Sequence, residues 1–285
     1  MVYHADDKFS NIAIISNYNT NPKNLISKFD SFLLFDQSDK LETIKYIAEN
    51  YPETRFVDNP GHSLRNYFEY IIENYDNLPN QIWFLKSNLI GRHIDVETFE
   101  EKIKKIGLIP LFNEVQFKDK KRIAHHLMPG YFIERNNSWF VDEHKSKYFL
   151  NADTLLRYLF VNPILPAFML FAPGANYGVD RNRILMYPIN FWKALSKIVS
   201  YSYFPAESYI VERILFIIFS AEYKHNELNF DQNWAAKLDN QQDLVTCQKN
   251  KRIKQKNNVP KRFNSRIQQK IINKLIFLLD KNGLI

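Results

Sequence analysis

The stretch NPGHSLRNYFEYIIENYDNLPNQIWFLKSN, residues 59–88, predicts a turn, a helix and a buried strand in direct succession. Asn59 and Gly61 favour a turn, and tyrosine and aliphatic side chains then recur at roughly helical spacing as far as Leu78. Pro79 ends the helix. The short apolar run QIWFL is typical of an interior strand, and it leads straight into a polar group. That group consists of Lys86, Ser87 and Asn88.

The same alternation of short apolar runs and helical patterns continues on both sides of this stretch. Strands are expected at residues 11–16, 31–35, 54–58 and 106–112, and helices at about 39–50 and 95–105. Strand and helix in turn predict an α/β fold with a mainly parallel sheet. Ligands of such sheets bind at the carboxyl ends of the strands, so polar residues that follow a strand are candidates for a binding site.

The second half of the chain is less regular. Residues 113–150 are polar and aromatic without a clear period, and we expect long loops there, whereas apolar helices should dominate between residues 151 and 222. With 285 residues, 45% of them hydrophobic, the chain can bury one large core. We therefore expect one domain over residues 1–245 and a separate tail over residues 246–285.

The tail carries nearly all of the excess positive charge. From Lys249 to the end there are 11 Lys and Arg residues and one acidic residue, a net of +10, which leaves a net of −3 for the preceding part. Basic and apolar residues each recur every four residues along this segment, which predicts an amphipathic helix with a basic face. Such a helix could lie on an anionic membrane or pack its apolar side on the domain. The basic residues at this spacing are Arg262, Arg266, Lys270 and Lys274, beside Phe263, Ile267, Ile271 and Leu275.

Several features point to a cytoplasmic protein that could still associate peripherally with a membrane. The first ten residues are polar and contain no basic leader, and no run reaches the roughly 18 apolar residues that a membrane span needs. Cys247, the single cysteine, allows no internal disulfide and fits a reducing compartment.

Familiar catalytic motifs are missing from the sequence. It contains no Gly-x-Gly-x-x-Gly and no phosphate loop that ends in Gly-Lys-Ser/Thr, which argues against a dinucleotide dehydrogenase or a P-loop NTPase. In GHSLR, Arg65 stands where a nucleophile elbow needs its second glycine, so a serine hydrolase is rejected. His125 and His126 are adjacent and point apart on regular structure, so we interpret them as loop histidines and predict no metal site there.

Four blocks of the sequence carry a resemblance to a known family. They are IISNYN, the opening stretch, GANYGVDRNRILMYPINFWKAL and YIVERILFIIF. Together they resemble an uncharacterised family of glycosyltransferase-like proteins, and the last two are similar to blocks of capsular-polysaccharide glycosyltransferases with a GT-A-type fold. The similarity covers roughly residues 11–93 and 171–222.

This resemblance implies a GT-A-like, Rossmann-like sheet flanked by helices, and a transferase of polysaccharide biosynthesis. The implied partners are a nucleotide-sugar donor and a glycan or lipid-linked acceptor. Enzymes of this type commonly use an Asp-x-Asp motif to hold Mn²⁺ or Mg²⁺ on the pyrophosphate of the donor, and this sequence has no Asp-x-Asp. The cofactor therefore stays open, and a basic side chain such as Lys86, Arg65 or His93 could compensate the diphosphate instead.

The expected donor-binding residues follow the early strands or begin the helix after the third strand. Residues 17–19 would meet the base or ribose, or form an ordinary polar turn. Asp36 would bind ribose or begin the DQSD turn. The complete set is Asn17, Tyr18, Asn19, Asp36, Arg65, Lys86, Ser87 and Asn88.

The expected acceptor and catalytic residues come mainly from the late blocks. Glycines there would let the backbone approach a sugar, and arginines could contact phosphate; the alternative is a bulged strand with a solvated helix start. The acceptor set is His93, Gly174, Asn176, Tyr177, Arg181 and Arg183. As catalytic base, Glu212 is preferred because it matches the Glu-Arg pair of the family, and Glu207 is the second choice. The alternatives are a structural ion pair for Glu212 and a helix-dipole role for Glu207.

Two other functions stay open at this point. The chain could be a catalytically inactive carbohydrate-binding or scaffold protein of the same fold, which the missing Asp-x-Asp favours. It could also bind nucleic acid through the basic segment KNKRIKQKNNVPKRFNSR, although nucleic acid is not the favoured partner.

Overall fold

The computed structural model describes residues 11–113, 124–128, 131–136, 146–243 and 245–246 of the chain. A six-stranded sheet forms its centre, with the order β3-β2-β1-β4-β9-β5. Strands β1 to β4 are mutually parallel, and β9 is antiparallel to both β4 and β5. The predicted α/β fold with a mainly parallel sheet is confirmed. The strands are β1 (Asn11–Asn17), β2 (Phe32–Asp36), β3 (Arg55–Phe56), β4 (Gln81–Lys86), β5 (Ile109–Pro110) and β9 (Tyr177–Asp180).

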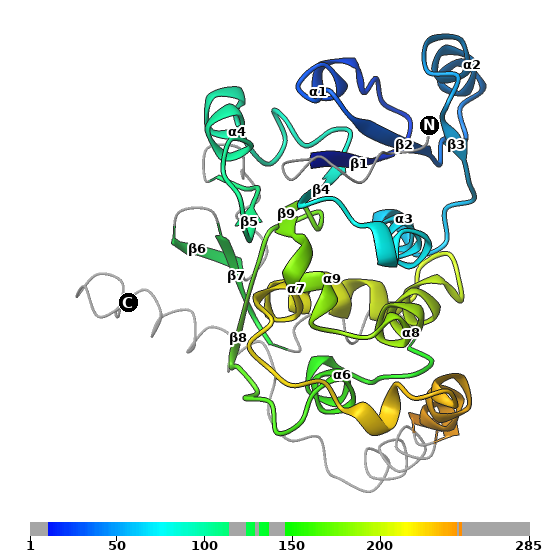
Figure 1. Cartoon of the computed structure of the whole chain (residues 1–285), viewed down its shortest axis with the longest axis vertical. Helices are drawn as coiled ribbons and strands as arrows, with labels where there is room; N and C mark the ends of the chain where they lie inside the picture. The colour runs from blue at the N-terminus through cyan, green and yellow to red at the C-terminus, as the bar shows by residue number, and fades with distance from the viewer. Residues whose placement is uncertain (1–10, 114–123, 129–130, 137–145, 244, 247–285) are drawn as a thin grey trace, which may run out of the picture.

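Helices cover both faces of the sheet (Figure 1). Successive residues of a strand point to opposite faces, so Ile15 and Trp83 pack on one side while Ile14 and Phe84 pack on the other. The first side is covered by α1 (Lys23–Ile26), α2 (Leu41–Asn50) and α4 (Val96–Lys102). The second side is covered by α3 (His62–Glu73), α8 (Ile189–Ser200) and α9 (Ala206–Ser220). Two shorter helices, α6 (Ala152–Leu159) and α7 (Arg181–Leu185), complete this layer.

A second, smaller sheet corrects the expectation of loops over residues 113–150. Strands β6 (Ala124–Met128) and β7 (Tyr131–Arg135) form an antiparallel pair, and β7 pairs with β8 (Phe168–Phe171). The prediction was wrong because β6 and β7 lack the clear apolar runs that marked the earlier strands, although β7 pairs both with the adjacent β6 and with β8, more than 30 residues further along the chain. Helices do dominate residues 151–222, and the strand at residues 177–180 lies inside the segment FAPGANYGVDRNRI around which they were expected; the strand at residues 168–171 was not predicted.

Gly178 shows how tightly the main sheet is packed. A Cβ atom at this position would lie 2.4 Å from the indole ring of Trp83 on the neighbouring strand. Glycine therefore serves the packing of β9 on β4 here, rather than the approach of a sugar.

No helix within the described ranges is long and apolar enough to cross a membrane. The predicted basic helix of the tail lies outside the described residues, and the division of the chain at residue 245 stays a prediction.

Candidate functional site

The polar residues that follow β1, β2 and β4 meet at one end of the sheet, where these parallel strands finish. This end is called the carboxyl edge. Because these strands are parallel, Asn17 lies beside Asp36, and Ser16 lies beside Lys86. The turn that precedes the antiparallel β9 reaches the same edge, where the Asn176 side chain accepts a 2.7 Å hydrogen bond from the backbone N–H of Lys86. The carboxyl edge of the sheet is therefore built from four strands that are far apart in sequence.

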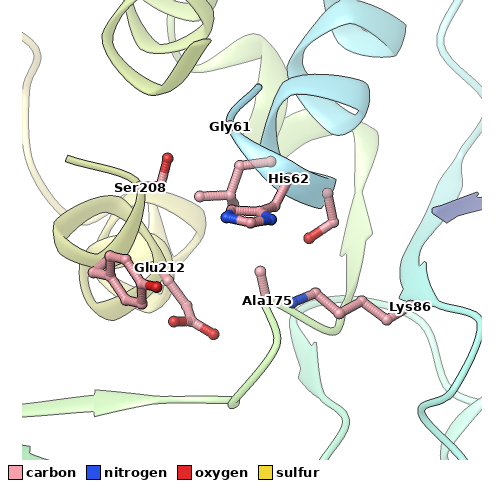
Figure 2. Close-up of a pocket in the computed structure, with 9 residues that line it drawn as sticks. Gly61, His62, Lys86, Ala175, Ser208 and Glu212 are labelled. Carbon is pink, nitrogen blue, oxygen red and sulfur yellow. The ribbon is translucent and has the colours of Figure 1, made fainter. Parts of the chain in front are cut away.

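A pocket of about 160 Å³ opens at this edge, between the first turn of α3 and the middle of α9. Its volume is close to the roughly 150 Å³ of a cavity that holds benzene, so it accommodates one six-membered ring or a group of similar size. The lining residues are Gly61, His62, Ser63, Leu64, Lys86, Ala175, Ser208, Tyr209 and Glu212. Figure 2 shows the Lys86 ammonium group and the Glu212 carboxylate directed into the same space, with the His62 ring on the far side of it.

Two strained turns border the pocket. Gly61 and His62 have φ angles of 73° and 54°, and Gly174 and Ala175 have φ angles of 81° and 59°. A Cβ atom on Gly61 would lie 2.5 Å from the carbonyl oxygen of Val199, so only glycine allows α3 to begin this close to α8. Left-handed backbone at residues with a side chain costs about 1–3 kcal/mol each and tends to accumulate at binding and catalytic sites.

Glu212 is the negatively charged group of the pocket. Its Oε1 accepts a 2.6 Å hydrogen bond from the backbone N–H of Gly174, and its Oε2 receives one of 2.9 Å from Arg213. Arg213 also binds Glu134 of β7 at 2.9 Å, so the guanidinium group is shared between two carboxylates. Burial alone would raise the pKa of Glu212, but the charges of Arg213 and Lys86 and the Gly174 N–H hold it below its ordinary value. Glu212 is therefore ionised at neutral pH.

Lys86 is the positively charged group of the pocket. It is the last residue of β4, and its side chain is partly buried. Within the described part of the chain its ammonium group forms neither a hydrogen bond nor an ion pair shorter than 4.0 Å. Burial lowers the pKa of Lys86, and the Glu212 carboxylate opposes that shift. An ammonium group held in this way is available to a ligand.

His93 lies behind Lys86, next to the Gly174 turn. A Cβ atom on Gly174 would lie 3.4 Å from both the Nε2 of His93 and the Cδ of Lys86, which places the three residues in one cluster. His93 is buried, and its Nδ1 has no hydrogen-bond partner among the residues that the structure describes. Burial, reinforced by Arg92 and Lys86, lowers the pKa of His93 to about 4, so the ring is neutral at physiological pH.

Beside the pocket, a polar network occupies the ends of β1 and β2. Asp36 Oδ1 accepts hydrogen bonds of 2.8 Å from Asn17 and 2.7 Å from Ser38, whereas the buried Oδ2 has no partner. Thr20 joins Asn17 to Ser87 through two hydrogen bonds of 2.6 Å. These side chains are thus held in fixed positions.

Two further donor candidates lie at the outer rim of the same edge. Tyr18 and Asn19 both bind the Asp39 carboxylate, at 2.8 and 2.7 Å. The hydrogen bond to Asp39 is the main reason that the pKa of Tyr18 rises to about 12. Asn88 lies in the turn that directly follows β4.

Other candidates are engaged elsewhere. The Arg65 side chain forms a 2.6 Å ion pair with Glu69 and does not line the pocket. Arg181 and Arg183 begin α7 at the opposite edge of the sheet, because Asp180 pairs with Gln81 at the start of β4. They are not part of the carboxyl-edge site.

Glu207, Asn176 and Tyr177 have structural contacts. Glu207 Oε1 accepts three backbone hydrogen bonds from residues 147–149, and Oε2 accepts one from the Tyr201 hydroxyl. Asn176 fixes the turn before β9 through Lys86 N–H and Pro173 C=O. The Tyr177 hydroxyl accepts a hydrogen bond from the Ala172 N–H in the core. None of the three lines the pocket.

Sequence reasoning thus named Lys86, Glu212 and the neighbouring Gly174, which the structure brings together, and missed the α3 side of the pocket. The missed lining residues are Gly61, His62, Ser63, Leu64, Ala175, Ser208 and Tyr209. The Asn-x-Gly turn was a usable signal for Gly61, whereas nothing local marks Ser208 or Tyr209.

A metal centre was also considered. Among the residues that the structure describes, no three or more His, Cys, Asp or Glu side chains are grouped so that they could hold a metal ion. The cofactor therefore stays open.

Comparison with known proteins gives one match. Residues 29–235 match the model of a family described as a protein of unknown function, DUF3431. The chain belongs to this family. The match spans the strands from β2 to β9 and both walls of the pocket. No curated protein and no solved structure matches the chain.

Proposed function

We propose that the pocket is the sugar-binding and catalytic site of a nucleotide-sugar-dependent glycosyltransferase with a GT-A-like fold. The observation that supports this most directly is the pair of opposite charges, Lys86 and Glu212, that face one small pocket at the carboxyl edge of a mainly parallel sheet. Glycosyl transfer needs both charges, because a diphosphate leaves and an acceptor hydroxyl loses its proton.

The size of the pocket supports the sugar, rather than the whole donor, as the group that it binds. About 160 Å³ holds one sugar ring and not a whole nucleotide-sugar. The nucleotide would then lie along the adjacent polar network, and the Asp36 Oδ2, which is buried and has no partner among the described residues, would meet a ribose hydroxyl only after the neighbouring side chains move. Asn17 and Ser87, which are fixed by Thr20, would complete this part of the site.

Glu212 would act as the general base in an inverting transfer. It is ionised, and the Gly174 N–H and Arg213 hold its two oxygens in place. As the acceptor oxygen bonds to the anomeric carbon, Glu212 takes the hydroxyl proton, and the bond from the sugar to the diphosphate breaks with its electron pair on the diphosphate. In a retaining transfer, the Glu212 carboxylate would need a role other than that of the general base.

The acceptor is proposed to be a glycan or a lipid-linked glycan of a surface polysaccharide. In the lipid-linked case the net charge of +10 in residues 249–285 would hold a cytoplasmic enzyme peripherally on an anionic membrane.

The test is release of nucleoside diphosphate from a panel of nucleotide-sugars. Glu212→Gln should lower kcat about 10²- to 10⁴-fold, as expected for loss of a general base, while the Kd of the donor changes little. Glu222→Gln, the same substitution at an exposed residue just beyond α9, is the matched control and should keep the wild-type rate.

Two results would contradict this proposal. Full activity in Glu212→Gln would remove the carboxylate from the mechanism. Binding of a nucleotide-sugar without turnover or transfer by the wild-type protein would favour an inactive carbohydrate-binding protein of the same fold.

A further inference from the structure

The two walls of the pocket differ in charge. The α9 wall carries Glu212, which shares the single positive charge of Arg213 with Glu134, so these three groups keep a net negative charge. The opposite wall consists of the first turn of α3, and Lys86 lies at the sheet end between the walls (Figure 2). Lys86 is the charged group of this arrangement that has no direct partner among the described residues. A ligand group with negative charge would supply one.

The first turn of α3 adds hydrogen-bond donors to the same side. The N–H groups of Ser63 and Leu64 have no backbone or side-chain acceptor among the described residues. The helix has 12 residues, no side-chain cap and no acidic residue in its first turn, so the partial positive charge of its N-terminus is not neutralised locally. Both residues line the pocket that Lys86 enters.

The backbone before this turn fixes the direction of these donors. Gly61 and His62 are both left-handed, and the chain then turns into the right-handed α3. A change from left-handed to right-handed backbone turns successive N–H groups toward a common point and produces an anion-binding concavity. The strained turn at Gly61 and His62 therefore borders the same pocket as the Lys86 side chain.

We infer that Lys86 and the Ser63 and Leu64 N–H groups form a binding site for a diphosphate. In the proposed glycosyl transfer this is the leaving group of the donor, which would lie on the α3 wall while its sugar faces Glu212 on the α9 wall. The diphosphate site thus rests on the proposed function for its role in the reaction. The contacts of Lys86 and the two N–H groups with a diphosphate, however, need neither a sugar nor a nucleobase. It also differs from the sequence-based expectation for Arg65, which is bound to Glu69.

Inorganic pyrophosphate is the direct probe, because it carries neither a sugar nor a nucleoside. Isothermal titration of the full-length protein in chelator should show binding, and Lys86→Met should weaken it about 10- to 100-fold, as expected for a charge-assisted hydrogen bond. Lys86→Arg, which keeps the charge, should recover part of the affinity. Lys45→Met on the exposed side of α2 removes the same charge outside the pocket and should leave the affinity unchanged.

Amide NMR spectra identify the other half of the site. Addition of pyrophosphate should shift the resonances of Ser63 and Leu64, and these shifts should disappear in Lys86→Met. Equal affinity of wild-type and Lys86→Met proteins, with shifts confined to residues 249–285, would overturn the inference and assign the anion to the basic tail. Binding that requires a divalent ion and ignores Lys86 would overturn it as well.

The two proposals can fail separately. Pyrophosphate that binds at Lys86 in a protein that uses no nucleotide-sugar would refute the proposed function and retain the diphosphate site. Sugar transfer that is unaffected by Lys86→Met but lost in Glu212→Gln would refute the diphosphate site and the part of Lys86 in the proposed function, and would retain transfer with Glu212 as the base.

Discussion

The two edges of the main sheet both carry basic side chains, yet these side chains are held very differently. At the amino edge, Arg183 binds Asp180 at 2.8 Å and donates to the carbonyl oxygens of Phe219 and Ser220 at the end of α9. At the carboxyl edge, the Lys86 ammonium group has no such partner in the part of the chain that the structure describes. The contrast shows that the partners of a cation, rather than its presence near a strand end, separate a structural charge from one that is available for binding.

The largest expected effect extends this contrast to the two carboxylates of α9. Glu207 is fully buried and accepts four hydrogen bonds, three of them from backbone N–H groups. In Glu207→Gln the amide oxygen can keep the three N–H groups only as neutral hydrogen bonds, and the NH₂ group replaces the oxygen that accepts from the Tyr201 hydroxyl, so we expect a loss of about 2 to 3 kcal/mol in the free energy of unfolding. Glu212→Gln should cost only about 1 kcal/mol, because Arg213 keeps its bond to Glu134.

Chemical denaturation of the two variants measures this difference. Both substitutions remove one negative charge from the same helix, so each is the control for the other. If Glu212→Gln destabilises the protein as much as Glu207→Gln does, Glu212 is a structural residue and the distinction between the two carboxylates is lost.

A second effect comes from the neutral His93 beside Lys86. Its pKa is about 4 in the folded protein and 6.5 in an unfolded chain, so the unfolded state binds more protons between these values. The free energy of unfolding should therefore rise with pH from 4 to 6.5, and His93 should contribute roughly 3 kcal/mol of that rise. Below pH 4 this contribution is lost.

Urea unfolding at several pH values tests the contribution of His93. His93→Gln should flatten the rise between pH 4 and 6.5. The matched control is His225→Gln, since burial also lowers the pKa of His225 but that residue is only half-buried and lies outside the pocket. An unchanged slope in His93→Gln, or a larger change in His225→Gln, would show that His93 is not the buried neutral group of the site.

The sequence was a good guide to the parallel strands of the main sheet. The apolar runs at residues 11–16 and 31–35 became β1 and β2, and the QIWFL run became β4, because each is buried on both faces and flanked by turn residues. Strands β7 and β8 were missed because their apolar content resembles that of the surrounding segments. The orientation of β9 was equally invisible in the local pattern.

The candidate site was predictable only in part. The strand-end rule pointed to Lys86 from a local signal, whereas Glu212 was named because it matches the Glu-Arg pair of the resembled family. The first turn of α3 was interpreted as a turn and helix start, and its position opposite α9 depends on the packing of α3 against α8 through residues such as Phe68 and Trp192. Arg183 had the same local signal as a phosphate ligand, but the antiparallel direction of β9 carries it to the other edge.

The contrast between Lys86 and Arg183 is tested most directly by their unfolding free energies. Lys86→Met removes a partly buried cation that lacks a partner, so the variant should be about 1 kcal/mol more stable than the wild-type protein. Arg183→Met removes an ion pair and two hydrogen bonds from a partly exposed side chain, and it should be about 1 to 2 kcal/mol less stable. A Lys86→Met variant that is destabilised as much as Arg183→Met would contradict the account, because Lys86 would then be a structural charge and not one held ready for a ligand.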